Sequence, residues 1–204
     1  MKRRGAIGSL SAAAGLGSLG GLGGLLLWPG RTRAQGRPDS AATMAAQRAA
    51  MGRLAFLDGL WRGTAVAGPA GAPQRQMVQT ERVGLALDGT VRVIEGRAHD
   101  ADGAVLFQSF GIVSFDPASN SFMLRAHADG QRGDFTFAVE PDGYAWEVPS
   151  GPGSVRYRAR VADGRWRQTG ELRMPERAPL EIFRMDLQRL GDTNWPAAGA
   201  VPAR

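Results

Sequence analysis

The stretch Phe56-Leu57-Asp58-Gly59-Leu60-Trp61-Arg62-Gly63-Thr64 is where the sequence changes from a helical to an extended pattern. Asp58-Gly59 predicts a tight turn, because Asp and Gly tolerate backbone conformations that other residues avoid. Trp61 then lies on one face of the first expected strand, between Gly59 and Gly63. A large aromatic beside two glycines can close the end of a barrel, because glycine lets another backbone approach closely. The stretch therefore predicts the start of a β-barrel with Trp61 near one end.

The rest of the chain repeats this extended pattern. Runs of alternating apolar and polar residues are separated by turn signals, most of them Asp-Gly pairs such as Asp129-Gly130 and Asp163-Gly164. Asp-Gly between such runs favours a two-residue hairpin, because both residues accept a positive φ. Closure removes the unpaired edges of a long meander, so we predict an all-β fold: an antiparallel up-and-down β-barrel of about 8–10 strands with one N-terminal helix at the barrel end. The expected strands are residues 60–67, 76–85, 90–97, 104–115, 121–128, 133–140, 144–148, 154–161, 165–174 and 179–190.

Residues 1–34 have the pattern of an export signal peptide. Lys2-Arg3-Arg4 precedes an apolar Gly/Leu/Ala-rich segment, and Thr32-Arg33-Ala34 offers a cleavage site. The arginine pair resembles a twin-arginine signal, although Lys2 stands where Ser or Thr is usual, so the export route stays open. An uncleaved membrane anchor is the alternative, because the apolar segment is long for a signal. We predict a periplasmic or secreted protein with no stable membrane span after cleavage.

Two further segments flank the predicted barrel of residues 56–190. Residues 35–55 are predicted to be a linker and an N-terminal helix, which Asp39 or Ser40 can cap and which carries a modest apolar stripe. A flexible, only partly helical N-terminus is the alternative. Residues 191–204, rich in Ala, Gly and Pro, predict a disordered tail.

Composition excludes several classes of function. The formal net charge is +6, but five of the 25 basic residues and no acidic residue lie in residues 1–34, which leaves 20 basic against 19 acidic side chains. The basic character therefore belongs to the leader, and we predict no nucleic-acid binding. The chain has no Cys, which excludes disulfides and thiolate chemistry.

Arginines alternate with apolar residues in the last strands. Arg156, Arg158 and Arg160 share one face, beside Arg165, Arg167 and Arg173 of the next strand, with Glu171, Glu181 and Asp186 as available partners. If this face is outward, it forms surface ion pairs, and if inward, it forms an anion pocket. We favour the outward orientation, because Tyr157 and Trp166 lie on the opposite face.

Few residues suggest catalysis or metal binding. The two histidines belong to no metal-binding or nucleophile motif. His127 is a weak haem candidate if it faces the lumen, and a satisfied or solvated histidine is the favoured interpretation. Glu81, Glu147, Glu171 or Asp186 could form inward carboxylate pairs, but charges that alternate along strands usually form a solvated outer face. We predict no catalytic residue, no metal site and no cofactor.

The opening stretch also resembles a known family. Phe56, Gly59, Trp61 and Gly63 fit the spacing at the start of the calycin group, whose lipocalin members begin their first strand with Gly-x-Trp after a short helix. The stretch is more similar to small exported bacterial lipocalin-like proteins of unknown function, and Phe115-Asp116-Pro117 resembles their central turn. The resemblance covers about residues 56–190. It implies a barrel closed at one end by the Trp, often an apolar or amphipathic ligand inside, and no catalytic residue.

We therefore predict a non-catalytic exported barrel that binds a small apolar or amphipathic ligand. A structural or partner-binding envelope domain with a filled core is the alternative, and a haem-binding or enzymatic barrel is a lesser one. The ligand identity and the oligomeric state stay open. The candidate ligand-binding residues are Trp61, Phe107, Arg125, Phe137, Trp146, Tyr157, Trp166 and Phe183.

Overall fold

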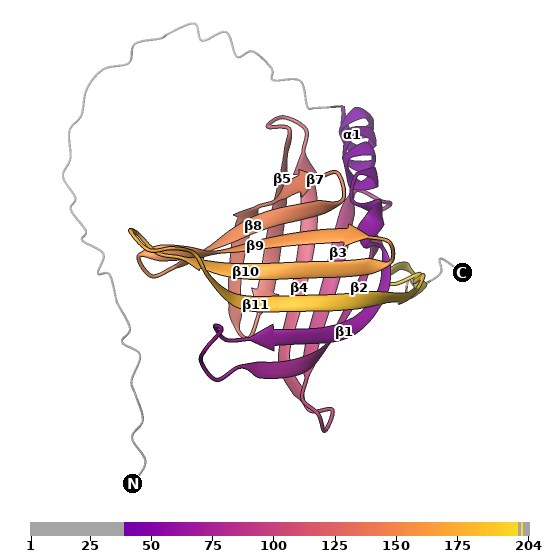
Figure 1. Ribbon diagram of the computed structural model, residues 1–204. Helices are drawn as coiled ribbons and strands as arrows, with labels where there is room; N and C mark the ends of the chain where they lie inside the picture. The colour runs from indigo at the N-terminus through magenta and orange to yellow at the C-terminus, as the bar shows by residue number, and fades with distance from the viewer. Residues whose placement is uncertain (1–38, 200, 202–204) are drawn as a thin grey trace, which may run out of the picture. The chain divides into compact units, whose positions relative to one another are not determined.

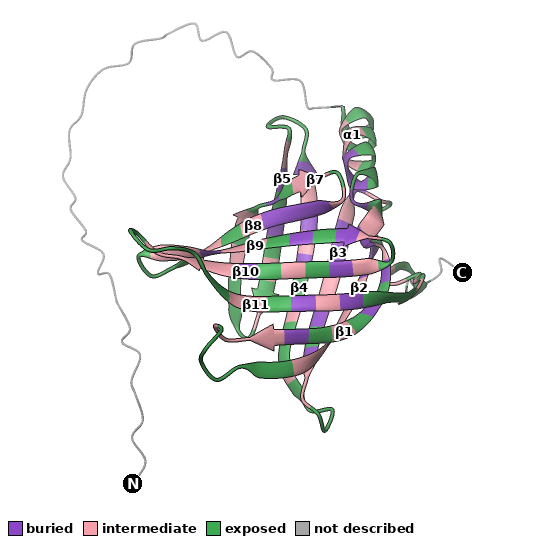
Figure 2. Cartoon of the chain, viewed as in Figure 1, coloured by how far each residue is buried: buried purple, intermediate pink, exposed green. Residues whose placement is uncertain are grey.

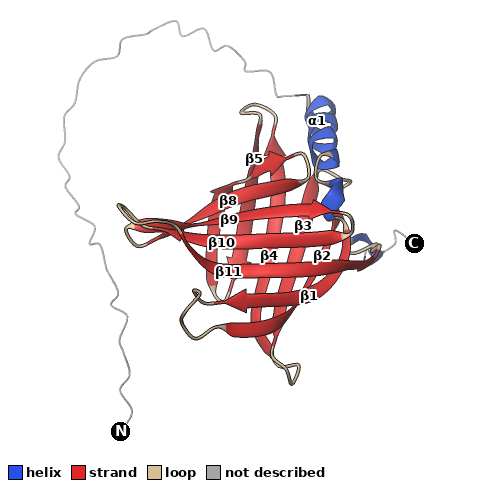
Figure 3. Cartoon of the chain, viewed as in Figure 1, coloured by secondary structure: helices blue, strands red, loops and turns tan. Residues whose placement is uncertain are grey.

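The computed structural model describes residues 39–199 and residue 201. The predicted signal peptide, residues 1–34, lies outside the described residues. No helix within the described part of the chain is long and apolar enough to cross a membrane. The elements, drawn in Figures 1 and 3, are α1 (Ser40–Gly52), η1 (Ala55–Leu57), β1 (Gly59–Ala67), β2 (Arg75–Ala86), β3 (Val91–His99), β4 (Val105–Asp116), β5 (Ser121–Ala128), β6 (Gln131–Thr136), β7 (Ala138–Glu140), β8 (Gly143–Ser150), β9 (Gly153–Ala162), β10 (Arg165–Arg173), β11 (Leu180–Gly191) and η2 (Ala197–Gly199).

The strands form one antiparallel sheet that curls into a nearly closed barrel. The strand order is β6-β5-β4-β3-β2-β1-β11-β10-β9-β8-β7, so consecutive strands pair except β6 and β7, and β1 also pairs with β11. In Figure 1, β8 to β11 and β1 run across the front of the barrel, and β2 to β5 run behind them at a steep angle. The predicted up-and-down barrel with a helix at one end is confirmed.

The two edges of this sheet are neighbours in sequence. β6 pairs with β5, β7 pairs with β8, and only Phe137 separates β6 from β7. The backbone N–H of Phe137 donates to the carbonyl of Phe122 on β5 at 3.0 Å. One bent stretch of chain, predicted as a single strand over residues 133–140, therefore bridges the edges and leaves little unpaired backbone.

The hairpin turns follow the Asp-Gly signals in part. Both residues have a positive φ in Asp88-Gly89, Asp129-Gly130 and Asp163-Gly164, as the prediction requires. In Asp102-Gly103 only the glycine does, because this turn belongs to a longer connection between β3 and β4. These turns fix the register, which in turn decides the residues that face the lumen.

Helix α1 lies at the closed end of the barrel. The Asp39 carboxylate caps it by accepting the N–H of Ala41 at 3.0 Å, as the sequence suggested. Gln47 donates to the carbonyl of Phe115 on β4, and the Arg53 guanidinium lies 5.2 Å from the Phe122 ring centroid. The helix thereby covers the ends of β4 and β5.

The apolar core fills this closed end. Leu54, Leu57, Val83 and Leu187 are completely buried, and Figure 2 shows buried and exposed residues alternating along the strands. Trp61 is 2% exposed, and its indole N–H donates to the Leu57 carbonyl at 2.9 Å. Its ring meets that of Trp166 edge-on with 5.6 Å between centroids. Trp61 closes this end of the barrel, and its one polar atom is satisfied.

The chain after β11 turns back over the outer face of the sheet. Trp195 is half-buried, its ring lies 4.4 Å from the Arg82 guanidinium, and it meets Phe110 edge-on. Gly84 leaves room for this segment, because a Cβ there would lie 1.9 Å from the Trp195 carbonyl oxygen. These contacts, and the inclusion of Gly191 in β11, differ from the disordered tail predicted for residues 191–204.

Candidate functional site: an apolar cavity in the barrel

A cavity of about 460 Å³ occupies the lumen between the closed end and the opposite mouth. Strands from every side contribute to its wall, with Met77, Ile94, Leu124 and Met185 among the apolar residues. A lining of this kind suits a small apolar molecule, because ligand pockets are concave, mostly apolar and contain few polar groups. The lumen is therefore not filled by side chains, which distinguishes it from the filled core of our alternative prediction.

Aromatic residues form one wall of the cavity. Trp146 and Tyr157 stack with centroids 4.6 Å apart, and Phe183 meets Tyr157 edge-on. Gly170 faces the Tyr157 ring, and a Cβ there would lie 2.8 Å from it. Rigid rings held by one another offer a ligand preformed contact area at little entropic cost.

Polar groups gather toward the closed end of the cavity. Glu81 on β2 accepts a hydrogen bond from the Gln79 amide at 2.7 Å. The Tyr144 hydroxyl donates to the Gln168 amide oxygen at 2.6 Å. Gln79 and Tyr144 are 5% and 4% exposed, so these hydrogen bonds are formed in a largely water-free environment.

Glu81 is a carboxylate held in apolar surroundings. It is partly exposed, and the surface that it exposes faces the cavity. Burial raises its pKa to about 7, against a smaller lowering effect of the Gln79 hydrogen bond. Burial also raises the pKa of Tyr144, and the nearby Glu81 carboxylate adds to that effect. Glu81 therefore changes charge near neutral pH, within reach of Tyr144.

A glycine makes the space for this carboxylate. Gly96 on β3 pairs with Glu81, and a Cβ at Gly96 would lie 2.6 Å from Oε1 and 2.8 Å from Oε2 of Glu81. The same atom would lie 2.7 Å from the Ser109 hydroxyl oxygen. The position of the carboxylate thus depends on the missing side chain at Gly96.

Most of the predicted ligand-binding residues lie around this cavity. Trp61 is not among the lining residues, because it is packed in the core beside Trp166. Those that do line the cavity are Phe107, Phe137, Trp146, Tyr157, Trp166 and Phe183. That these residues bind a ligand stays a prediction.

Arg125 and His127 lie outside the barrel. Both alternate with the inward-facing Leu124 and Ala126 on β5, so the pleat directs them to the outer face. Arg125 is exposed and donates two hydrogen bonds to Asp134, at 2.7 and 2.8 Å. We predicted that Arg125 contacts a ligand in the lumen, but the structure places its side chain on the outer face of the barrel. The haem alternative required His127 to face the lumen, and His127 likewise faces outward.

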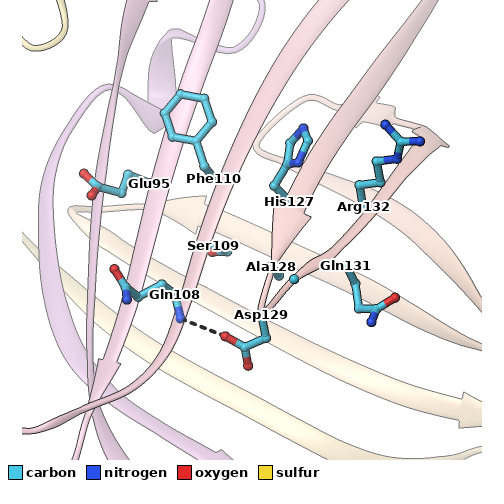
Figure 4. A pocket seen from close by; sticks show the side chains of 10 residues that line it. Glu95, Gln108, Ser109, Phe110, His127, Ala128, Asp129, Gln131 and Arg132 are labelled. Atoms are coloured by element: carbon cyan, nitrogen blue, oxygen red, sulfur yellow. Dashed lines mark hydrogen bonds between the residues drawn. The ribbon is translucent and has the colours of Figure 1, made fainter.

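His127 instead belongs to a shallow depression on the outer surface (Figure 4). The register places Glu95, Phe110, His127 and Arg132 in one row across β3 to β6, and Figure 4 shows their side chains rising from the same side of the strands. Because this face is open to solvent, it offers none of the enclosure that the lumen has.

The arginines of β9 and β10 face outward, as favoured from the sequence. Arg158 pairs with Glu140 at 2.8 Å, and Arg165 pairs with Asp186 at 2.7 Å. Arg167 shares Asp186 with Arg165. Exposed ion pairs of this kind contribute little to stability, and they place no anion pocket in the lumen.

Sequence reasoning did not single out the polar groups that the structure brings together. Glu81 was considered among four carboxylates, and it alone faces the cavity. Apolar and polar residues alternate only weakly along its strand, because Met77 and Val78, which are neighbours at the start of β2, are both apolar. The sequence around Arg92 did not indicate that this residue is buried, since an arginine between Val91 and Val93 would be expected on the outer face. In the structure Arg92 is 1% exposed and faces inward at the closed end.

Comparisons with known proteins support the fold. No known family model and no curated protein sequence matches the chain. The structure is similar to the crystal structure of Rv2717c from M. tuberculosis, with a TM-score of 0.52 and 13% sequence identity over 69% of this chain and 96% of that chain. The likeness concerns the fold alone. Together with the nearly closed antiparallel barrel, it fits a lipocalin-like barrel fold.

Proposed function

We propose that the protein binds a small apolar or amphipathic molecule in the lumen of its barrel and that it is not an enzyme. The observation that supports this proposal is the cavity of about 460 Å³, lined mostly by aliphatic and aromatic side chains. Pockets that bind small molecules span roughly 300–1,000 Å³ and have this kind of lining. Burial of a ligand's apolar surface supplies the binding free energy, and the stacked Trp146 and Tyr157 rings limit the entropic cost.

We further propose that the protein belongs with small exported bacterial lipocalin-like proteins. The support is the Phe56, Gly59, Trp61 and Gly63 spacing together with the barrel that follows it. Residues 1–34 carry the features of an export signal, which would place the mature barrel in the periplasm or outside the cell. Fractionation of cells that express the full chain, with sequencing of the mature N-terminus, tests this localisation.

Uptake of an uncharged hydrophobic fluorophore tests the binding function. Delipidated protein is titrated with N-phenyl-1-naphthylamine, whose emission rises in an apolar environment. Saturable uptake, and native mass spectrometry that detects a small molecule in protein taken from its own host, are the expected results. Protein that neither takes up the fluorophore nor carries any small molecule would contradict the proposal.

A further inference from the structure

The cavity wall holds one carboxylate, that of Glu81, without a cation beside it among the described residues. Two charged residues of the described part of the chain line the cavity, Glu81 and Arg75. Arg75 is exposed at the start of β2, and six residues of extended strand, roughly 20 Å, separate it from Glu81. Carboxylates in apolar surroundings normally have a partner of opposite charge. The lumen therefore lacks the cation that its inward carboxylate would take.

The strands around Glu81 turn uncharged side chains toward it or toward the cavity. These residues are Trp61 on β1, Gly96 on β3, Ser109 on β4, Tyr144 on β8, and Trp166 and Gln168 on β10. Tyr144 is the titratable residue among them, and burial raises the pKa of its hydroxyl, which therefore stays uncharged near neutral pH.

The charged groups nearest to Glu81 on β3 are already paired. Glu95 acts on it from the outer side of the strand, where Arg82 and Arg97 both bind Glu95. Arg92 faces inward nearer the closed end, but it is held by Asp58 and does not line the cavity. A cation for Glu81 has to come from a ligand.

Glu81 and Ser109 present oxygen atoms to the same part of the lumen. Among the described residues the Gln79 amide donates to Oε1 of Glu81, and no donor reaches Oε2. A Cβ at Gly96 would lie 2.8 Å from this Oε2 and 2.7 Å from the Ser109 hydroxyl oxygen. Because both oxygens lie this close to one point, they are near enough to each other for one nitrogen to bind both.

Donors at this end of the lumen are engaged within the protein. The Gln79 amide donates to Glu81, and the Tyr144 hydroxyl donates to the Gln168 amide oxygen at 2.6 Å. The Trp166 indole nitrogen is buried next to Tyr144. This end therefore suits a ligand head group that donates hydrogen bonds rather than one that accepts them.

We propose that the lumen takes a primary alkyl or arylalkyl amine, whose ammonium group binds between Glu81 and Ser109. A primary ammonium has three N–H donors and no acceptor, which matches these oxygens. The apolar body of the ligand then lies along Trp146, Tyr157 and Phe183 toward the mouth. This inference rests on the proposed binding function and adds the chemical class of the ligand.

Other head groups fit these oxygens less well. A carboxylate would bring a second negative charge beside Glu81. A hydroxyl can donate once, and an uncharged hydrogen bond is about half as strong as a charge-assisted one. A trimethylammonium group keeps the positive charge but has no N–H to donate. Desolvation opposes the burial of any ammonium, and donation to both Glu81 and Ser109 offsets that cost for the primary amine.

Four probes of equal chain length separate these head groups: decylamine, decyltrimethylammonium, decan-1-ol and decanoate. Delipidated full-length protein is titrated with each by calorimetry at about pH 8, where Glu81 is mostly ionised and a primary amine is protonated. We expect decylamine to bind best and decanoate to bind worst. Decan-1-ol and decyltrimethylammonium should bind at least about tenfold more weakly than decylamine, the ratio that one charge-assisted hydrogen bond produces.

Acid should weaken the binding of decylamine. The pKa of Glu81 is about 7 in the empty lumen, so at about pH 5.5 the carboxyl group must release its proton before it can pair with the ammonium. The affinity for decylamine should therefore fall at least about tenfold between about pH 8 and about pH 5.5. Decan-1-ol needs no ionised partner and should lose less.

Two matched variants locate the effect. Glu81→Gln should remove both the preference for decylamine and its loss in acid. Glu147→Gln removes a carboxylate from the exposed outer face and should leave all four affinities unchanged. Uptake of the uncharged fluorophore reports whether each variant retains a folded lumen.

The outcomes distinguish a wrong head group from a wrong function. If the fluorophore binds but decylamine binds no more tightly than decan-1-ol at about pH 8, the head-group inference is overturned while the binding function stands. The same holds if the preference survives Glu81→Gln or is insensitive to acid. If Glu81→Gln no longer takes up the fluorophore, the pH series of the unsubstituted protein decides. If neither the fluorophore nor any of the four probes binds, the proposed function itself is wrong.

Discussion

Arg92 on β3 donates two hydrogen bonds to the carboxylate of Asp58, at 2.7 Å from Nε and 2.8 Å from a terminal nitrogen. A third, from the other terminal nitrogen, reaches the Met51 carbonyl in α1 at 2.6 Å. One side chain, 1% exposed, thus joins the end of the helix, the extended residue between η1 and β1, and the inner face of β3. The pair holds these three segments together at the closed end of the barrel, next to the cavity.

Asp58→Ala leaves the Arg92 guanidinium buried without its countercharge. We expect the free energy of unfolding to fall by about 3 kcal/mol, the lower end of the range for a broken buried pair, because the Asp58 side chain is 36% exposed. Urea denaturation followed by tryptophan fluorescence measures this loss.

The outer face provides a geometrical match for this pair. Arg125 donates to Asp134 at the same two distances, 2.7 and 2.8 Å, but both side chains are exposed. Asp134→Ala should therefore change stability little, because water solvates the arginine that remains. If the two substitutions lowered the free energy of unfolding equally, the burial of Arg92 would not explain how much the Asp58–Arg92 pair stabilises the protein.

Gly63→Ala should destabilise the barrel severely. A Cβ at this position would lie 2.1 Å from the backbone carbonyl oxygen of Asp186 on β11, and backbone cannot move aside as a side chain can. We expect a loss of about 2–3 kcal/mol or failure to fold. Thermal unfolding followed by circular dichroism checks it.

Gly52, at the end of α1, serves as the control. A Cβ there meets nothing within 4 Å, and the residue is exposed. Gly52→Ala should therefore be neutral or stabilising by up to about 1 kcal/mol, because alanine favours helix. Similar melting temperatures for Gly63→Ala and the unsubstituted protein would contradict the close approach of β1 and β11.

The contrast between Trp61 and Arg92 shows what the sequence could indicate. Trp61 stands between glycines in a recognisable spacing, and the alternation around it predicted both its strand and its burial. The strand positions and most hairpins followed from the same local rules of alternation and turn chemistry. Arg92 is buried only because Asp58 and the Met51 carbonyl, distant in sequence, meet it at the closed end. No local pattern encodes such a meeting.

The cavity was predictable in kind but not in detail. Alternation grouped Tyr157 and Trp166 on an apolar face, and the ion pairs of the arginines settle that this face is inward. Alternation alone could not place Arg125, because it does not say which of the two sets of alternate residues on β5 faces inward, and the wrong choice puts every side chain of that strand on the opposite face. It also could not show Glu81 beside Tyr144, which lie on strands far apart in sequence.

Glu81 should make the barrel less stable as the pH rises through neutrality. Its pKa of about 7 in the folded protein lies above the ordinary value of 4.5, so the folded chain holds a proton that the unfolded chain has lost between these values. Stability therefore falls from about pH 4.5 to about pH 7 and then levels off, by about 3 kcal/mol in all. Urea denaturation at a series of pH values measures the slope.

Glu81→Gln isolates this contribution from the other titrating groups. The substitution removes the titration, so its stability should vary less across the same window than that of the unsubstituted protein. Asp186 acts the other way, because its arginine partners lower its pKa and its contribution is lost only in acid. Parallel pH profiles for the two proteins would show that Glu81 is not buried against the cavity in solution.

Ala126→Phe should close the cavity without breaking the barrel. Ala126 lines the cavity on β5, and a phenyl ring there would occupy space that is open in the lumen. We expect uptake of the uncharged fluorophore to fall at least about tenfold, while the free energy of unfolding changes by less than the 1–3 kcal/mol typical of overpacking a filled core. Fluorophore titration and urea denaturation give the two quantities.

Met123→Phe on the same strand separates cavity filling from a general effect of the ring. Met123 is 43% exposed and points to the outer face, so its substitution should leave both uptake and stability unchanged. Uptake that survives Ala126→Phe at full strength would place the fluorophore outside the lumen. A severe loss of stability in Ala126→Phe, with Met123→Phe unaffected, would instead mean that the lumen is already filled by side chains, which is the arrangement of a structural barrel rather than of a binding protein.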